Sequence, residues 1–126
     1  MTDFARTGAS YTENAATDPL VTDAFMAALG ATYCGEIDPR DPGVSPLYGD
    51  WSGLPPLLIL AGGIEMLRDD GKMCVEAARK QGADAAYHEG EGMAHIWTLF
   101  ADRLPEAREG LAVIGDFVRH NMAAHG

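Results

Sequence analysis

The chain has 126 residues, 47% of them hydrophobic and 22% charged, a balance that excludes a wholly disordered protein and fits one folded domain. Its net charge of −10, with nine lysines and arginines scattered along the sequence, argues against nucleic acid and anionic membrane surfaces as partners. Two cysteines, Cys34 and Cys74, are too few for a disulfide scaffold, and we expect both to be small buried hydrophobic residues. No apolar run reaches the roughly 20 residues of a membrane span.

The N-terminal part predicts a loop followed by a helix. Residues 1–17 are polar and lack periodicity, so we expect a tail or loop there. They show neither the basic nor the apolar region of a secretion signal, which makes a cytoplasmic location the default expectation. Asp18 and Pro19 form a strong helix start, since Asp caps a first turn and proline is suited to its first position. The predicted helix runs to about Tyr33 and ends at Gly35.

A proline-rich stretch separates this helix from the first predicted strand. Five prolines between residues 36 and 56 predict a long ordered loop. The apolar run at residues 57–61 follows, and Gly62 and Gly63 close it. A strand that is apolar on both faces is typical of the interior of a parallel sheet.

The remaining elements alternate between helix and strand. We expect a helix at residues 70–81, a short strand at 85–87, a loop at 90–94 and a long helix from about Pro105. An apolar stripe on the last helix is expected to pack on the sheet and consists of Leu104, Ala107, Leu111, Ile114, Phe117 and Val118. The order strand, helix, strand, helix predicts an α/β fold with two parallel strands and flanking helices. Two strands are fewer than a sheet normally needs to be stable alone.

His95 is the strongest candidate for a chemical role. It lies in a loop after the second predicted strand, where Gly90 and Gly92 give the backbone freedom and Ile96 and Trp97 would anchor the far side by apolar packing. A histidine on such a loop can accept a proton from a nucleophile and return it to a leaving group. The simpler alternative is a histidine that caps a turn. The other histidines are less promising: His88 lies within or at the end of the second strand, and His120 and His125 lie in the terminal helix and its tail.

Glu65 is the candidate acid. It follows the first predicted strand and its glycines, at the edge where α/β sheets present functional groups. Its role would be to hold the histidine ring in the right tautomer and to stabilise its positive charge. Asp69 and Asp70 are close rivals, although helix capping explains them more simply. Taken alone, Glu65 would be an ordinary surface glutamate, and only its pairing with His95 favours a catalytic role.

Other kinds of site have weaker support. The three serines, Ser10, Ser45 and Ser52, lie outside any G-x-S-x-G motif, so no nucleophile matches the acid and histidine. No metal-binding spacing such as H-E-x-x-H and no phosphate-binding glycine motif occurs, and we expect neither metal nor cofactor. An acyl pocket could be lined by Trp97, Leu99 and Phe100, of which we expect at least one to be core.

Seven short motifs occur in an order that resembles a known family. They are DPL at 18–20, DPRDP at 38–42, SPL at 45–47, LPPLLI at 54–59, EMLRDD at 65–70, GMAHIW at 92–97 and LPEA at 104–107. In this order they resemble the C-terminal part of the bacterial hormone-sensitive-lipase-like esterases, the α/β-hydrolase fold-3 family. The resemblance covers nearly the whole chain from about Ser10.

The resemblance implies a fold, an activity and a site. Residues 18–126 would form a partial α/β-hydrolase domain lacking the family's N-terminal half, which carries the serine elbow and the oxyanion loop. The family's histidine falls on His95, and its acid, aspartate or glutamate, falls on Glu65. Members hydrolyse short acyl esters without a cofactor, and many form homodimers through the last strand. We therefore expect a segment that is inactive alone. The alternative is a non-catalytic interaction module that dimerises through exposed strand edges.

Overall fold

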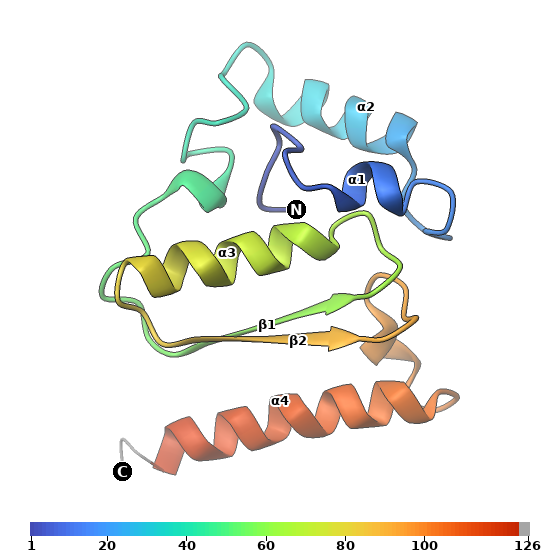
Figure 1. Ribbon diagram of the computed structural model, residues 1–126, viewed down its shortest axis with the longest axis vertical. Helices are drawn as coiled ribbons and strands as arrows, with labels where there is room; N and C mark the ends of the chain where they lie inside the picture. The colour runs from blue at the N-terminus through green and yellow to red at the C-terminus, as the bar shows by residue number, and fades with distance from the viewer. Residues whose placement is uncertain (124–126) are drawn as a thin grey trace. The chain divides into compact units, whose positions relative to one another are not determined.

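The computed structural model describes residues 1–123, so His125 lies outside the described part of the chain (Figure 1). The chain forms two compact units, Met1–His95 and a second unit that begins at Ile96. Among the described residues, no helix has the length and apolar character needed to cross a membrane. The two units are considered separately below.

Two parallel strands form the sheet of the first unit and confirm the predicted α/β class. β1 (Leu57–Gly62) pairs with β2 (Ala85–Gly90) in a register that runs from Leu57 opposite Ala85 to Gly62 opposite Gly90. β1 coincides with the predicted apolar run. β2 is longer than the predicted strand at 85–87, because backbone pairing with β1 continues through its polar last residues.

Helix α3 (Arg68–Lys80) connects the two strands and lies along the sheet (Figure 1). It matches the helix predicted at 70–81 to within two residues. Gly71 approaches the sheet so closely that an added Cβ would lie 3.1 Å from side-chain atoms of Ile59 and Tyr87. Val75 and Ala78 continue this face in the buried apolar cluster between helix and sheet.

Residues 1–17 form mostly a loop, one of the two predicted alternatives, and not a solvated tail. They contain the short helix α1 (Ser10–Glu13), and Asp3 and Ser10 are fully buried within the first unit. These two side chains turn inward and are hydrogen-bonded there, which a polar composition alone does not distinguish from solvation.

The helix predicted to start at Asp18 begins later. Helix α2 (Asp23–Cys34) starts after Thr22, whose side chain accepts the cap hydrogen bond from the Phe25 N–H, and ends at Gly35 as expected. Asp18 instead accepts hydrogen bonds in a loop. The proline-rich stretch contains one short 3-10 helix, η1 (Pro46–Tyr48), within otherwise irregular backbone.

The second unit contains a 3-10 helix, η2 (Trp97–Phe100), and the long helix α4 (Pro105–Ala123), which starts where proline predicted it. Trp97 is buried, and its ring lies against Gly110, where an added Cβ would be 3.3 Å from the indole nitrogen. Ala107 is also buried, whereas Leu111 and Val118 of the predicted stripe are exposed. The expected packing of this stripe on the sheet stays a prediction.

Candidate functional site

Glu65 and His95 lie at the carboxyl ends of the two strands. Glu65 occupies the turn between β1 and α3, and His95 lies five residues beyond β2. Parallel strands end at the same edge of a sheet, so both loops emerge side by side. Glu65 is 3% exposed, which is unusual for a glutamate and requires that its carboxylate be paired or hydrogen-bonded.

Both oxygens of the Glu65 carboxylate have partners. Oε2 is hydrogen-bonded to Nδ1 of His95. Oε1 accepts a hydrogen bond from the Gly62 N–H at 2.8 Å. The structure therefore brings together the two residues that the sequence singled out, thirty positions apart.

The pairing changes the acid–base behaviour of the ring. The hydrogen bond that the His95 ring donates to the Glu65 carboxylate raises the pKa of His95 above its ordinary value, and partial burial of the ring opposes this effect. The nearby charges of Asp18 and of the N-terminal amino group have smaller and opposite effects on the same pKa. With Nδ1 bonded to the carboxylate and the side chain 39% exposed, Nε2 is the nitrogen suited to exchange a proton with another group.

Backbone hydrogen bonds join the two loops directly. The Gly63 N–H donates to the Gly90 carbonyl at 2.8 Å, and the Ile64 N–H donates to the Met93 carbonyl at 3.2 Å. These bonds hold the residues before Glu65 against those before His95. The distance between acid and imidazole is thus set by main-chain geometry as well as by the side chains.

Asp69 and Asp70, the other two candidate acids, bind partners other than His95. Asp70 is buried at the start of α3 and accepts hydrogen bonds from the Thr2 and Asp3 N–H groups and from the Tyr11 hydroxyl. Burial raises the pKa of Asp70, against the effect of these donors. The buried Asp70 carboxylate therefore anchors the N-terminal segment to α3.

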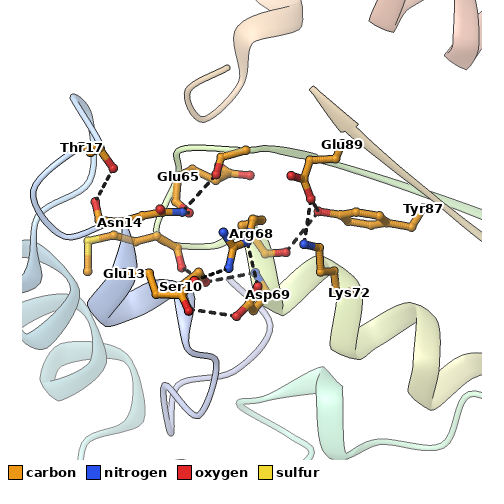
Figure 2. Close-up of polar contacts among 12 residues, drawn as sticks. Ser10, Glu13, Asn14, Thr17, Glu65, Arg68, Asp69, Lys72, Tyr87 and Glu89 are labelled. Carbon is orange, nitrogen blue, oxygen red and sulfur yellow. Dashed lines mark hydrogen bonds and ion pairs between the residues drawn. The ribbon is translucent and has the colours of Figure 1, made fainter. Parts of the chain in front are cut away.

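Asp69 has a similar structural role. It pairs with Arg68 and accepts from the Ser10 N–H, while Arg68 also pairs with Glu13 (Figure 2). Neither Asp69 nor Asp70 is the hydrogen-bond partner of His95, and of the three candidate acids only Glu65 is bonded to it.

A small cavity adjoins the pair. It has a volume of about 140 Å³, and its lining includes Glu65, His95, Asp70 and Cys74. Ligand pockets usually measure about 300–1,000 Å³, so this cavity is too small to hold an ester substrate by itself. Within the described residues, no three histidine, cysteine or carboxylate side chains gather as a metal site would require.

The serines are committed to structural hydrogen bonds. Ser10 and Ser45 are fully buried and donate to the carbonyl oxygens of Met66 and Pro39. Ser52 is exposed and donates to Asp50. A serine activated by His95 would have to donate a hydrogen bond from its hydroxyl to the ring. The hydroxyls of these three serines donate to other groups instead.

The three pocket candidates and the other histidines lie in different elements. Trp97 is core within the second unit, as expected for at least one of the three pocket candidates, whereas Leu99 and Phe100 are exposed. Ile96 is 46% exposed with a left-handed backbone, so of the two residues predicted to anchor the far side of the His95 loop only Trp97 is buried. His88 lies within β2 and His120 within α4.

Asn14 is a residue of this site that the sequence analysis missed. It follows α1, is 8% exposed, and donates hydrogen bonds to the backbone carbonyls of Glu65 (Figure 2) and of Gly63. An asparagine in a polar segment carries no sequence signal for such a contact, because its partners lie 49 and 51 positions away.

Comparison with known proteins connects this geometry to a family. Residues 1–99 match a family described as having the alpha/beta hydrolase fold. An acetyl-hydrolase from Streptomyces hygroscopicus is 39% identical over 117 residues, which are 93% of this chain and 39% of that protein. An esterase from Acinetobacter venetianus is 34% identical over 116 residues, 91% of this chain and 38% of that protein.

Solved structures agree. A crystal structure of an esterase from the bacterial hormone-sensitive lipase family matches with a TM-score of 0.90 at 42% identity, covering 95% of this chain and 40% of that one. EstE5, at 31% identity, matches with a TM-score of 0.91 and covers 97% and 41%. The chain thus spans about 40% of the length of the relatives it matches. It belongs to the α/β-hydrolase-fold family of the bacterial hormone-sensitive-lipase-like esterases, as the resemblance of its motifs implied.

Proposed function

We propose that this chain is the segment of a short-acyl carboxylic-ester hydrolase that supplies the acid and the histidine of a Ser–acid–His site. The observation that carries the proposal is the hydrogen bond between Glu65 and Nδ1 of His95, at the carboxyl ends of adjacent parallel strands. The similarity to proteins named acetyl-hydrolase and esterase supports an ester as the substrate class.

In this proposal His95 acts as the proton shuttle. Nε2 accepts the proton of a serine hydroxyl as that oxygen attacks the ester carbonyl, and then returns the proton to the leaving alcohol. Glu65 keeps the proton of the neutral ring on Nδ1 and stabilises the imidazolium that forms. The raised pKa of His95 supports this role, because it means that the carboxylate favours the charged ring.

The 126-residue chain itself should be inactive. None of its serines stands in a G-x-S-x-G motif, and all three hydroxyls have structural partners. Removing only the nucleophile from such a site lowers turnover by about 10⁶-fold. We expect hydrolysis of p-nitrophenyl acetate by this chain at the rate of the buffer, with His95→Ala indistinguishable from the unaltered chain.

A chimera tests the positive half of the proposal. This chain would replace the matching 117-residue stretch of the Streptomyces hygroscopicus acetyl-hydrolase. We expect acetyl-ester hydrolysis by the chimera, abolished by His95→Ala and strongly reduced by Glu65→Gln, with His88→Ala as the matched control that keeps activity. A folded chimera whose activity survives His95→Ala would refute the assignment.

The alternative, an interaction module, has one observation in its favour. The sheet of the described part contains β1 and β2 alone, so each strand has one hydrogen-bonded neighbour and one open edge. An open edge can pair with a second copy of the chain. Gel filtration and a thermal melt test this. A discrete dimer with a cooperative melt favours the module, and a heterogeneous or molten species favours a segment that requires the rest of a hydrolase.

The cytoplasmic location expected above also stays a prediction.

A further inference from the structure

The direction of the Glu65 carboxylate depends on the turn that carries it. Glu65 lies within the five residues between β1 and α3, and its backbone N–H donates to the Gly62 carbonyl at 3.3 Å. A five-residue turn fixes a side chain only if its peptide planes are held, because each unbonded peptide can rotate and redirect the next Cα–Cβ bond.

Asn14 holds two of these peptide planes at once. Its Nδ2 donates to the carbonyl of Glu65 at 2.8 Å (Figure 2). The same nitrogen donates to the carbonyl of Gly63 at 3.2 Å. Asn14 is itself held in place, since its N–H donates to the Ser10 carbonyl and its own carbonyl accepts from the N–H groups of Thr17 and Asp18. One buried amide therefore joins the peptide between residues 63 and 64 to the peptide between residues 65 and 66.

Asp18 and Ser10 hold the next residue of the turn from the same segment. The Asp18 Oδ2 accepts from the Met66 N–H at 2.8 Å, and the Ser10 hydroxyl donates to the Met66 carbonyl at 2.7 Å. Asp18 is oriented by the N–H groups of Leu20 and Val21, which donate to its Oδ1.

We propose that Asn14, supported by Asp18, is a positioning residue for the acid of this site: it fixes the turn so that the Glu65 carboxylate meets Nδ1 of His95. The inference rests on the proposed function and adds to it. Groups that act together in a site must be held to within about 0.5 Å, and a donor that spans two carbonyls of the turn can impose that tolerance. Neither the Glu65 nor the His95 side chain contacts Asn14 through a hydrogen bond, so Asn14 acts through the backbone.

Histidine titration by NMR in the full 126-residue chain tests the proposal. The unaltered chain should show His95 titrating above an ordinary histidine, and Glu65→Gln should remove that difference. Asn14→Ala changes no charge, so the effects on His95 of Asp18 and of the N-terminal amino group remain. If Asn14 positions the acid, Asn14→Ala lowers the titration midpoint of His95 toward that of Glu65→Gln, and Asn14→Gln, which keeps the amide donors, restores part of the difference.

Ser45→Ala is the matched control. Ser45 is also fully buried and bonds two backbone groups, the Phe4 N–H and the Pro39 carbonyl, but none in the Glu65 turn. Its loss should lower stability while leaving the His95 titration unchanged. If Asn14→Ala does not melt cooperatively, Asn14→Ser replaces it, because the serine hydroxyl keeps a polar group at this position but has one donor and cannot bond both carbonyls, so the His95 midpoint should fall there too.

The outcomes separate this inference from the proposed function. A His95 that titrates like a free histidine in the unaltered chain would refute the acid–histidine pair itself. A raised midpoint that persists in folded Asn14→Ala or Asn14→Ser would overturn the positioning role alone. Failure of both Asn14 variants to fold, with Ser45→Ala folded, would also overturn it, since Asn14 would then be required for the whole unit.

Discussion

Gly62 lies so close to Met93 that no side chain fits between them. A Cβ added at Gly62 would lie 2.2 Å from the Met93 carbonyl oxygen and 2.6 Å from that of Ala94. Real Cβ atoms do not approach backbone oxygens to such distances. The glycine at the end of β1 is therefore required by the loop that leads to His95.

Gly62→Ala should destabilise the chain and move the Glu65 carboxylate away from the His95 ring. We expect a loss of more than about 3 kcal/mol in the free energy of unfolding, because either β1 or the His95 loop must move away. Urea unfolding followed by circular dichroism measures this. Gly30→Ala is the matched control, since its added Cβ would have only an ordinary contact with Phe4 at 3.7 Å in helix α2. That variant should gain about 0.5–1 kcal/mol. Equal effects of the two substitutions would contradict the steric argument.

Stability should depend on pH through the acid–histidine pair. The pKa of His95 is raised in the folded chain, so the stabilisation by the pair is fully present below the pKa of an unfolded histidine, about 6.5. It is lost as the pH rises through the folded-state pKa. Over this window the free energy of unfolding should fall more steeply for the unaltered chain than for Glu65→Gln.

Glu89→Gln is the control for this pH series. Glu89 pairs with Lys72, and the bond from Lys72 lowers the pKa of Glu89. Its stabilisation is therefore present at all pH values above the ordinary range of a glutamate and should leave the slope near pH 6.5 and above unchanged. Parallel slopes for the unaltered chain and Glu65→Gln would show that the pair does not couple to folding.

The Tyr11 hydroxyl should stabilise the buried Asp70. It donates to the Asp70 Oδ1 at 2.9 Å, and burial raises the pKa of Tyr11 so that the hydroxyl stays protonated as a donor. Tyr11→Phe leaves the buried carboxylate with one donor fewer and should cost about 1–3 kcal/mol. Tyr33→Phe retains the ring stacked on Phe4 in an exposed position and should change stability by less than about 0.5 kcal/mol. Chemical unfolding of both variants provides the comparison.

The two cysteines should be unreactive while the chain is folded. Cys34 and Cys74 are buried, and burial raises the pKa of the Cys74 thiol, which lowers its thiolate fraction. A chromogenic disulfide reagent should react slowly with the native chain and rapidly with both thiols in denaturant. Cys74→Ala identifies which thiol any native reaction belongs to. Fast modification of Cys74 in native buffer would show that the cavity beside it opens readily.

The sequence predicted the parts of this molecule that depend on local pattern. The apolar run ending at Gly62, the helix ending near Gly82 and the proline start of α4 all lie where periodicity and turn residues indicated. The meeting of Glu65 and His95 was also predictable, because parallel strands fix which loops share an edge.

The errors lie where tertiary contacts override local signals. Asp18 with Pro19 is a strong helix start, but the Asp18 carboxylate is used by Met66, 48 positions away, and α2 begins at Asp23. Among residues 1–17, Asp3, Ser10 and Asn14 are buried because partners far along the chain accept from or donate to their side chains. Asn14 was missed for the same reason, since nothing local distinguishes an amide that bonds a turn 51 residues downstream.

The N–H groups of Gly63 and Ile64 donate hydrogen bonds to the carbonyls of Gly90 and Met93, so the loop that carries Glu65 and the loop that carries His95 are joined through their backbones. Thermal motion of the sheet would therefore move both loops together, and the distance between the Glu65 carboxylate and the His95 ring would change little. Substitutions that weaken distant packing should therefore leave this pair assembled until the strands themselves part.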